Sequence, residues 1–384
     1  MAVKFLPGNR LTLLNSGAEY FPALIGAIGK ARREIHLESY IFENDDTGRA
    51  VADALADAAR RGVIVRVLVD GFGASGFAEQ FQPQLAAAGV QALVYRPDIA
   101  RFRLRRHRLR RLHRKLVAID GEIAFVGGIN VIDDRTPQFP TRHDYAVRVE
   151  GPLLGPIQLA LRRVWELVVW ARLNRRYRLP KALHQPPKAR GQQTAAFLVR
   201  DNIRHRRDIE QAYLAAIATA RDNILLANAY FLPGRRFRRA LYRAARRGVK
   251  VVILLQGQVE YRLLHYATQA LYGRMLSAGI RIFEYRRGFL HAKVAVIDRY
   301  WATVGSSNID PFSLLLAREA NVVVQDRSFA EELRRSLGLE MRDGAQELRA
   351  DRWQRLPWHS RLLRWASYSL VRMFVGLVGY SGRH

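Results

Sequence analysis

The sequence predicts an α/β protein made of two duplicated α/β/α sandwich domains that are related by a pseudo-two-fold axis. Residues 1–150 and 196–330 form an internal repeat, in which AARRGVIVRVLVDG (Ala58–Gly71) matches AARRGVKVVILLQG (Ala244–Gly257). Short apolar, β-branched segments alternate with helical patterns in both halves, which is typical of a sheet covered by helices on both faces. Both halves then carry the same pair of short strands.

Each half is expected to run helix, strand, helix, strand, helix, strand and then the paired strands, giving a mostly parallel sheet. EIHLESYIF (Glu34–Phe42) matches NILLANAYFL (Asn223–Leu232), and Leu159–Trp170 is expected to form a helix with an apolar stripe. Pro, Arg and Gln are frequent in residues 171–195, which predicts a linker. The expected divisions are therefore a first domain (1–170), a linker (171–195), a second domain (196–345) and a C-terminal segment (346–384).

One nineteen-residue stretch occurs twice, as LHRKLVAIDGEIAFVGGIN (Leu112–Asn130) and LHAKVAVIDRYWATVGSSN (Leu290–Asn308). A single His-x-Lys-x4-Asp is a weak signal, but a second copy with the same downstream Gly and Asn is not expected by chance. The candidate catalytic residues share these motif positions: His113, Lys115, Asp120 and Asn130 in the first copy, and His291, Lys293, Asp298 and Asn308 in the second.

Each copy is expected to form a strand, a tight turn and a second strand. Side chains two residues apart share one face of a strand, so His113 and Lys115 point the same way. The Asp lies seven residues after the His, which is an odd offset. We therefore expect the Asp to fix the turn, and the chemistry to belong to His, Lys and Asn. For one copy alone, a His and a Lys on a solvated strand face would be an equally good interpretation.

Charge and composition restrict the class of protein. Lys and Arg number 63 against 34 Asp and Glu, a net charge of +29. A folded protein this basic is expected to bind a polyanion, either nucleic acid or an anionic membrane surface. The absence of cysteine excludes disulfides, thiolate zinc sites and Cys nucleophiles. Residues 1–17 contain no apolar run long enough for a signal peptide or a spanning helix, so we expect a cytoplasmic location.

Two segments are candidates for lipid contact. Ala100–Lys115 carries eight arginines, whose donors suit phosphate oxygens, although a solvated basic face is the alternative. Pro357–Tyr380 has a basic amphipathic pattern that fits a helix lying in the membrane interface; the alternative is a terminal helix packed on the protein's own core. The candidate membrane- or substrate-binding residues in the two segments are Arg105, Arg106, Arg108, Arg110, Arg111, Trp365 and Arg372.

At the duplicated motif the chain resembles the phospholipase D superfamily, whose signature is a repeated His-x-Lys-x4-Asp-x6-Gly-Gly/Ser-x-Asn. The resemblance covers nearly the whole chain. The chain is similar to bacterial cardiolipin synthases of the B type in stretches such as HDYAVRVEG and AREANV. It implies that the two motifs meet between the halves in one active site. It also implies an orienting acid for each imidazole: Asp144 for His113, and Glu319 for His291.

Two His and two Lys around one phosphate indicate phosphodiester chemistry without a metal or another cofactor. One imidazole would attack phosphorus and form a phosphohistidine, and the other would act as general acid and base. The lysines would neutralise the phosphate oxygens, and Asn130 and Asn308 would donate hydrogen bonds to them. The symmetry of the motifs leaves the nucleophile open; well-studied members of the superfamily imply His113.

The resemblance implies a cardiolipin synthase, in which one phosphatidylglycerol transfers its phosphatidyl group to another and glycerol is released. Phosphatidylethanolamine as the donor stays open. The expected partners are anionic phospholipids (phosphatidylglycerol and cardiolipin) and the cytoplasmic face of the inner membrane, contacted peripherally, with only non-specific binding of nucleic acid. The alternatives are a phospholipase D-type hydrolase, a nuclease of the same superfamily, and a non-catalytic lipid- or nucleic-acid-binding module.

Overall fold

The computed structural model describes residues 3–97, 111–135, 141–171, 187–201, 205–310, 317–355 and 357–379. The elements of the first half are β1 (Leu6–Asn15), α1 (Ser16–Gly29), β2 (Glu34–Ser39), α2 (Asp46–Arg60), β3 (Ile64–Asp70), α3 (Phe77–Gln80), α4 (Gln82–Ala87), β4 (Gln91–Tyr95), β5 (Arg111–Leu112), β6 (Lys115–Ile119), β7 (Ile123–Gly127), β8 (Arg142–His143), β9 (Tyr145–Glu150) and α5 (Leu154–Ala171).

The second half repeats this order and adds elements at its end. Its elements are β10 (Gln193–Arg200), α6 (Asp208–Thr219), β11 (Asn223–Asn228), α7 (Arg235–Arg246), β12 (Lys250–Gln256), α8 (Arg262–Ser277), β13 (Arg281–Tyr285), β14 (Phe289–Leu290), β15 (Lys293–Ile297), β16 (Trp301–Gly305), β17 (Ala317–Gln325), α10 (Arg327–Gly344), β18 (Ala345–Glu347), α11 (Ala350–Gln354) and α12 (Trp358–Gly379). The α/β class and the internal repeat are confirmed.

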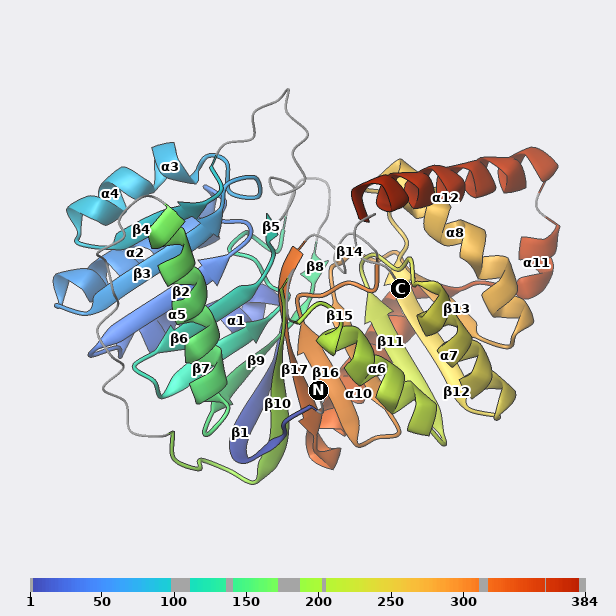
Figure 1. The fold of residues 1–384 in the computed structure, drawn as a ribbon, viewed down its shortest axis with the longest axis horizontal. Coiled ribbons are helices and arrows are strands. Elements are labelled where there is room, and N and C mark those ends of the chain that lie inside the picture. Colours follow the sequence, from blue (N-terminus) through green and yellow to red (C-terminus); the bar gives the residue numbers. More distant parts are fainter. Residues whose placement is uncertain are drawn as a thin grey trace.

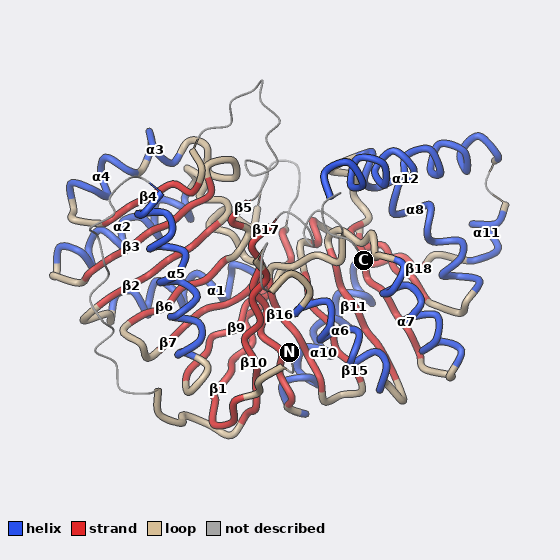
Figure 2. The backbone as a smooth tube through the Cα atoms, viewed as in Figure 1, coloured by secondary structure: helices blue, strands red, loops and turns tan. Residues whose placement is uncertain are grey.

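Most strands form one continuous mixed sheet, in the order β18-β13-β12-β11-β15-β16-β17-β10-β1-β9-β7-β6-β2-β3-β4 (Figures 1 and 2), to which β5 adds beside β17, while β8 and β14 form a separate pair. The two predicted sheets are thus joined edge to edge where β1 pairs with β10, and the strand order is the same outward from this pair in both halves. The prediction of a mostly parallel sheet is wrong. Along this order only β2-β3-β4 and β11-β12-β13 are parallel, and all the other neighbours are antiparallel. The motif strands are joined by tight turns, which connect only antiparallel neighbours.

One buried cluster runs through both halves. It combines Leu154 and Leu161 of α5 with Phe329 and Leu337 of α10 and with strands on both sides of the β1–β10 pair. The helices α1 and α2 cover one face of the first half, and α6, α7 and α8 cover one face of the second. Because they share a core, the halves are fixed relative to each other, and side chains from both can build a single site.

The repeat is broken at one buried ion pair in the first half. Arg114 donates from Nε (2.9 Å) and from Nη2 (2.6 and 2.7 Å) to the carboxylate of Glu38, and both residues are buried. The equivalent positions of the second half hold Ala292 and Ala227, both fully buried in the shared core. The same architecture therefore tolerates either a charged or an apolar pair at this place.

The predicted linker and basic run lie partly outside the described residues. Of residues 171–195, those from 172 to 186 are not described, and β10 already begins at Gln193. Arg105, Arg106, Arg108 and Arg110 also lie outside the described residues. The helix predicted at Leu159–Trp170 is confirmed as part of α5.

The C-terminal helix α12 lies across α8 on the outer side of the second half (Figure 1). Ser367 and Val371 are buried, and Val371 belongs to the core under α8. Large apolar side chains on the remainder of α12 are exposed, among them Trp358 (76%) and Trp365 (63%). The helix therefore packs by a narrow stripe and leaves an apolar face open. No helix in the described part of the chain is long and apolar enough to cross a bilayer.

Candidate active site

The two motifs form matching hairpins. Strands β6 and β7 pair from Lys115–Gly127 to Ile119–Ile123, and β15 and β16 pair in the same way. The predicted strand, turn and strand are confirmed in both copies. Asp120 and Asp298 end the first strand of each hairpin with φ of 55° and 52°.

The motif carboxylates have a structural role at these turns. Asp120 accepts backbone N–H groups of Arg32, Arg33 and Glu34 at 2.8–2.9 Å, and Asp298 accepts those of Arg221, Asp222 and Asn223 at 2.7–3.0 Å. Each Asp thus binds the loop that leads into β2 or β11, at the end of its strand opposite the His. They hold the scaffold and do not face the reacting centre.

Each motif His directly follows a two-residue strand that pairs with a strand of the other half. β5 pairs in parallel with β17, and the backbone N–H of His113 donates to the Arg318 carbonyl at 3.0 Å. β14 pairs in parallel with β8, and the N–H of His291 donates to the His143 carbonyl at 2.8 Å. Because β17 and β8 lead into the acids, each imidazole is delivered to the acid of the opposite half.

The predicted pairing, Asp144 with His113 and Glu319 with His291, is wrong, because the structure exchanges the two acids. Nδ1 of His113 lies 3.0 and 3.1 Å from the two carboxylate oxygens of Glu319, and Nδ1 of His291 lies 2.6 Å from Oδ2 of Asp144. The four residues identified from the resemblance do meet, but each pair is formed across the halves. The crossed strand pairs β5–β17 and β8–β14 are the reason.

Burial lowers the pKa of both imidazoles, and that of His291 falls well below its usual value. The charges of Lys293, Arg142 and Lys115 add to the effect on His291. In the neutral imidazole, the carboxylate partner holds the proton on Nδ1 and leaves the lone pair on Nε2. A neutral His with a free Nε2 is the form required of a nucleophile or a general base.

The two motif lysines are buried and close enough to influence one another. Lys115 Nζ donates to the His113 carbonyl at 2.8 Å, and Lys293 Nζ donates to the His291 carbonyl and lies 3.4 Å from Asp144 Oδ2. Burial lowers the pKa of Lys115 to about 7, aided by the charge of Lys293, and burial lowers that of Lys293 to about 8. Two crowded ammonium groups provide a centre for a phosphodiester anion.

The motif asparagines lie beside this centre. Asn130 Oδ1 accepts the N–H of Ile41 at 3.1 Å, while its Nδ2 is buried without a hydrogen-bond partner among the described residues. Asn308 Oδ1 accepts the N–H of Tyr230 at 3.4 Å in the equivalent way. With the oxygen engaged, the amide NH₂ of Asn130 is the group left to donate, as a phosphate oxygen would require.

The two acids are held differently, so the site is not symmetric. Ser306 Oγ donates to Glu319 at 2.5 Å. The equivalent first-half residue is Gly128, where an added Cβ would lie 2.4 Å from Asp144 Oδ1. The shorter acid therefore needs a glycine beside it. The longer acid gains a hydroxyl donor.

Tyr40 is a site residue that sequence reasoning did not single out. Its ring centroid lies 4.8 Å from that of His113, and Lys115 Nζ lies 5.3 Å from the Tyr40 ring centroid. The repeat offered no signal for it, because the equivalent position in the second half is Ala229, and Tyr230 corresponds to Ile41. Its ring forms a wall that keeps the first His and Lys together.

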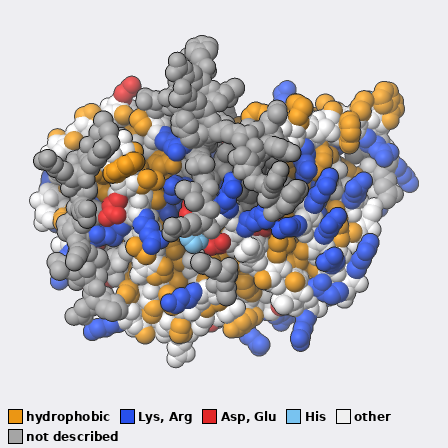
Figure 3. Space-filling model, in the orientation of Figure 1, with side chains coloured by type: hydrophobic (Ala, Val, Ile, Leu, Met, Phe, Trp, Pro, Cys, Tyr) orange, Lys and Arg blue, Asp and Glu red, His pale blue; other side chains and the backbone are white. Residues whose placement is uncertain are grey.

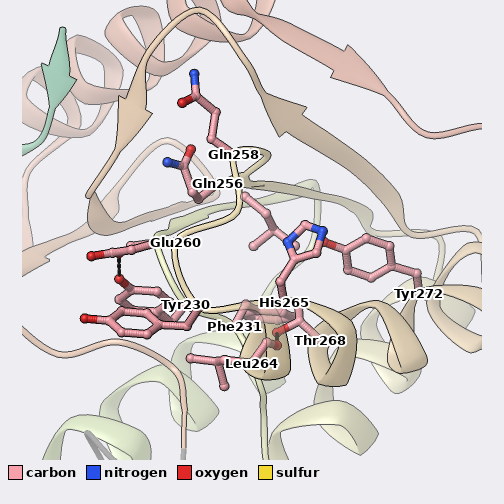
Figure 4. A pocket seen from close by; sticks show the side chains of 12 residues that line it. Tyr230, Phe231, Gln256, Gln258, Glu260, Leu264, His265, Thr268 and Tyr272 are labelled. Atoms are coloured by element: carbon pink, nitrogen blue, oxygen red, sulfur yellow. Dashed lines mark hydrogen bonds between the residues drawn. The ribbon is translucent and has the colours of Figure 1, made fainter. Parts of the chain in front are cut away.

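A small cavity beside the second motif shows how the His-bearing segments are anchored. In Figure 4, Tyr230 points to Glu260 and donates its hydroxyl hydrogen to that carboxylate. Gln256 lines the same cavity, and its Oε1 accepts the N–H of Leu290, the residue before His291, at 3.2 Å. In the first half, Asp70 accepts the N–H of Leu112 at 2.8 Å. The residues that end β12 and β3 therefore position both motif imidazoles.

The candidate lipid-contact residues that can be placed lie in different settings. Arg111 packs 5.2 Å from the Phe72 ring and 3.7 Å from Asp70, next to the first motif. Trp365 and Arg372 are exposed on α12. Sequence reasoning missed a further basic surface on α7, where Phe237 and Leu241 are buried and arginines occupy the exposed positions. The spacing in RRFRRALYRAAR was the available signal.

Comparisons with known proteins agree with this geometry. The family described as "Cardiolipin synthase, PLD-like domain" matches residues 24–154 and 213–338. Cardiolipin synthase B of Escherichia coli K12 is 38% identical, with 100% of this chain and 93% of that protein covered. Cardiolipin synthase 1 of Bacillus cereus is 29% identical over 95% of this chain and 71% of that protein.

Solved structures share the fold at low sequence identity. The crystal structure of phosphatidylserine synthase from Haemophilus influenzae Rd KW20 has a TM-score of 0.73 at 14% identity, covering 98% of this chain and 96% of that one. With the duplicated motifs, the crossed His–acid pairs and full-length similarity, the chain belongs to the phospholipase D-like family of cardiolipin synthases.

Proposed function

We propose that this chain is a phosphatidyltransferase that makes cardiolipin and glycerol from two phosphatidylglycerol molecules. The observation that carries the proposal is the single centre built from both halves, in which each neutral imidazole is held by the other half's acid beside two buried lysines. Such a centre can bind one phosphodiester and act on it from two sides. The full-length similarity to proteins named cardiolipin synthase B supports the choice of lipid.

In the first step, His113 Nε2 attacks the phosphorus of the donor lipid and the bond from phosphorus to the glycerol oxygen breaks. The bound phosphodiester anion raises the pKa of His291, which then carries the proton that it gives to the leaving oxygen. The lipid is left on His113 as a phosphohistidine, and free glycerol departs. His291 is left neutral, with its Nε2 lone pair facing the site.

In the second step, His291 removes the proton from a hydroxyl of the second phosphatidylglycerol. The resulting oxygen attacks phosphorus, the bond from phosphorus to His113 breaks, and cardiolipin forms. Lys115 and Lys293 neutralise the phosphate oxygens in both steps, and the Asn130 amide donates to one of them. The assignment of attack to His113 and of proton transfer to His291 follows well-studied members of the superfamily.

We also propose that the protein acts peripherally on an anionic membrane. Exposed apolar residues of α12 can enter the interface, and Arg238 of α7 donates to the Tyr368 hydroxyl, which ties the basic helix to α12. Figure 3 shows hydrophobic side chains over the α12 edge and Lys and Arg side chains over the neighbouring surface. The net charge of +29 suits the anionic cytoplasmic leaflet of the inner membrane, which we infer to be the working face.

Incubation of the purified protein with phosphatidylglycerol vesicles and EDTA tests the proposal. We expect cardiolipin and glycerol in equal amounts, and neither product with His113→Ala or His291→Ala. Phosphatidic acid as the sole lipid product would replace the proposal with a hydrolase. Absence of lipid turnover, with cleavage of single-stranded or duplex DNA, would replace it with a nuclease.

A further inference from the structure

A polar groove of about 600 Å³ lies between the two halves, next to β8. The first half contributes the start of α1, residues 133–135 and Thr141–His143, and the second half contributes Tyr285, Arg287 and Glu340. The volume is within the usual range for small-molecule sites, about 300–1,000 Å³. None of the motif His, Lys, Asp or Asn residues lines it.

The carboxylates that line the groove are already engaged within the protein. Asp134 accepts the N–H of Gly17 at 2.5 Å, Asp133 accepts that of Thr47 at 3.0 Å, Asp46 pairs with Arg49 at 2.5 Å, and Glu340 accepts from the Tyr285 hydroxyl at 2.8 Å. The basic lining residues are Arg135, Arg142 and Arg287. The four carboxylates keep their charge, so the lining as a whole is close to neutral. The three arginines, however, form no salt bridge among the described residues, and they are the groups of the groove that can bind an anion.

Arg142 connects the groove to the catalytic centre. Its guanidinium lies 5.1 Å from the Phe289 ring centroid, and the Phe289 ring stacks on that of His291 with centroids 6.0 Å apart. Arg142 Nε is buried and has no hydrogen-bond partner among the described residues. The positive charge of Arg142 contributes to lowering the pKa of His291. An anion bound by Arg142 would thus be separated from His291, the proposed general base, by the ring of Phe289.

We propose that this groove binds the headgroup of the acceptor phospholipid, with Arg142 on its phosphate and Arg287 supporting it. The inference rests on the proposed function and names the second substrate's site. In a glycerophosphate headgroup, the terminal hydroxyl is five covalent bonds of about 1.5 Å each from phosphorus. Five such bonds span at most about 7 Å, so a phosphate held at Arg142 lets the hydroxyl extend toward the side of Phe289 and His291, where His291 removes its proton.

Comparison of two acceptors on the same donor tests the proposal. Radiolabelled free glycerol can exchange into phosphatidylglycerol through the same intermediate but carries no phosphate, whereas acceptor phosphatidylglycerol does. For Arg142→Met and Arg287→Met we expect cardiolipin formation to fall about tenfold or more, and glycerol exchange to fall less than about threefold. Arg142→Lys should recover part of the loss. Arg60→Met, which removes an exposed cation whose salt bridge in the described part of the chain is with Asp57, is the control.

The outcomes separate this inference from the proposed function. Equal losses of exchange and cardiolipin formation in both variants would mean that the arginines serve the donor or the chemistry, and would overturn the acceptor site. Unchanged cardiolipin formation would overturn it as well. A wild-type protein that neither exchanges glycerol nor forms cardiolipin would refute the proposed function itself. If Arg142→Met fails to fold, Arg287→Met and inhibition of the wild type by soluble glycerol phosphate decide the matter.

Discussion

Replacement of Asp144 by Asn removes one charge from the centre and keeps the side chain's shape. Asp144 Oδ2 accepts from His291 Nδ1 at 2.6 Å and lies 3.4 Å from Lys293 Nζ, while Oδ1 accepts the N–H of Tyr145 at 2.8 Å. The Asn amide can keep the Tyr145 contact with its oxygen. It then turns its NH₂ toward His291, which favours the tautomer protonated on Nε2 and leaves His291 unable to accept a proton there.

The size of the effect follows from the two contacts that are lost. A hydrogen bond to a charged group contributes about 1.5–3 kcal/mol, and the longer contact to Lys293 adds less. A loss of about 2.7–4 kcal/mol corresponds to a fall in turnover of about 10²–10³. Asp208→Asn is a matched control, because Asp208 also pairs with a His, His205 at 2.7 Å, but on the surface. We expect it to change turnover less than about twofold.

A donor lipid with a p-nitrophenol leaving group shows which imidazole each acid serves. This leaving group departs without a proton, so variants that lack the general acid regain release of p-nitrophenol, and variants that lack the nucleophile do not. We expect Asp144→Asn to behave like His291→Ala and to be rescued. We expect Glu319→Gln to behave like His113→Ala and to stay inactive. If Asp144→Asn behaves like His113→Ala, the crossed pairing is refuted.

Three further predictions follow from named groups. The pKa of Lys115 is lowered to about 7, so its positive charge is present below that pH and lost above it. The kcat/KM for phosphatidylglycerol should therefore fall as the pH rises above about 7. A flat profile up to pH 9.5 would contradict this prediction. Trp365→Ser should weaken binding to anionic vesicles about tenfold in a sedimentation assay, while Trp170→Ser, which alters an equally exposed Trp on α5, should not. Glu38→Gln should lower the free energy of unfolding in urea by about 3–5 kcal/mol, because Arg114 stays buried without a carboxylate partner. The double variant Glu38→Gln with Arg114→Met should recover most of that stability. Equal destabilisation of the single and the double variant would refute this interpretation of the pair.

The candidate catalytic residues could be singled out from the sequence because the duplicated motif keeps them at constant offsets. His113, Lys115 and Asn130 reappear as His291, Lys293 and Asn308, and local alternation was enough to predict the two hairpins beside which they lie. The role of Asp120 was also foreseen in part. Its odd offset removed it from the His face, and the structure shows it binding the loop before β2. The sequence could not show which backbone the carboxylate would hold.

The pairing of imidazoles and acids could not be predicted, because it depends on how the halves dock. The strands that cross over, β5 and β14, have two residues each, which is too short for any periodic pattern. The strands β1 and β10 join the halves but were not expected, because the predicted order of elements in each half begins with a helix. The packing of Arg142 on Phe289 is likewise a long-range contact, and no local signal in TRHDYAV indicates it.

Capture of the covalent intermediate tests most directly the claim that two crossed His–acid pairs form one double-displacement centre. The wild type, mixed with phosphatidylglycerol labelled in its acyl chain and quenched in base within milliseconds, should carry label on the peptide that contains His113. The label should be lost in acid, as expected for a phosphorus–nitrogen bond, and should be absent from His113→Ala and from Glu319→Gln. Label on His291 would reverse the assigned roles. Turnover without label on either His, with inversion of configuration at phosphorus, would contradict the covalent mechanism.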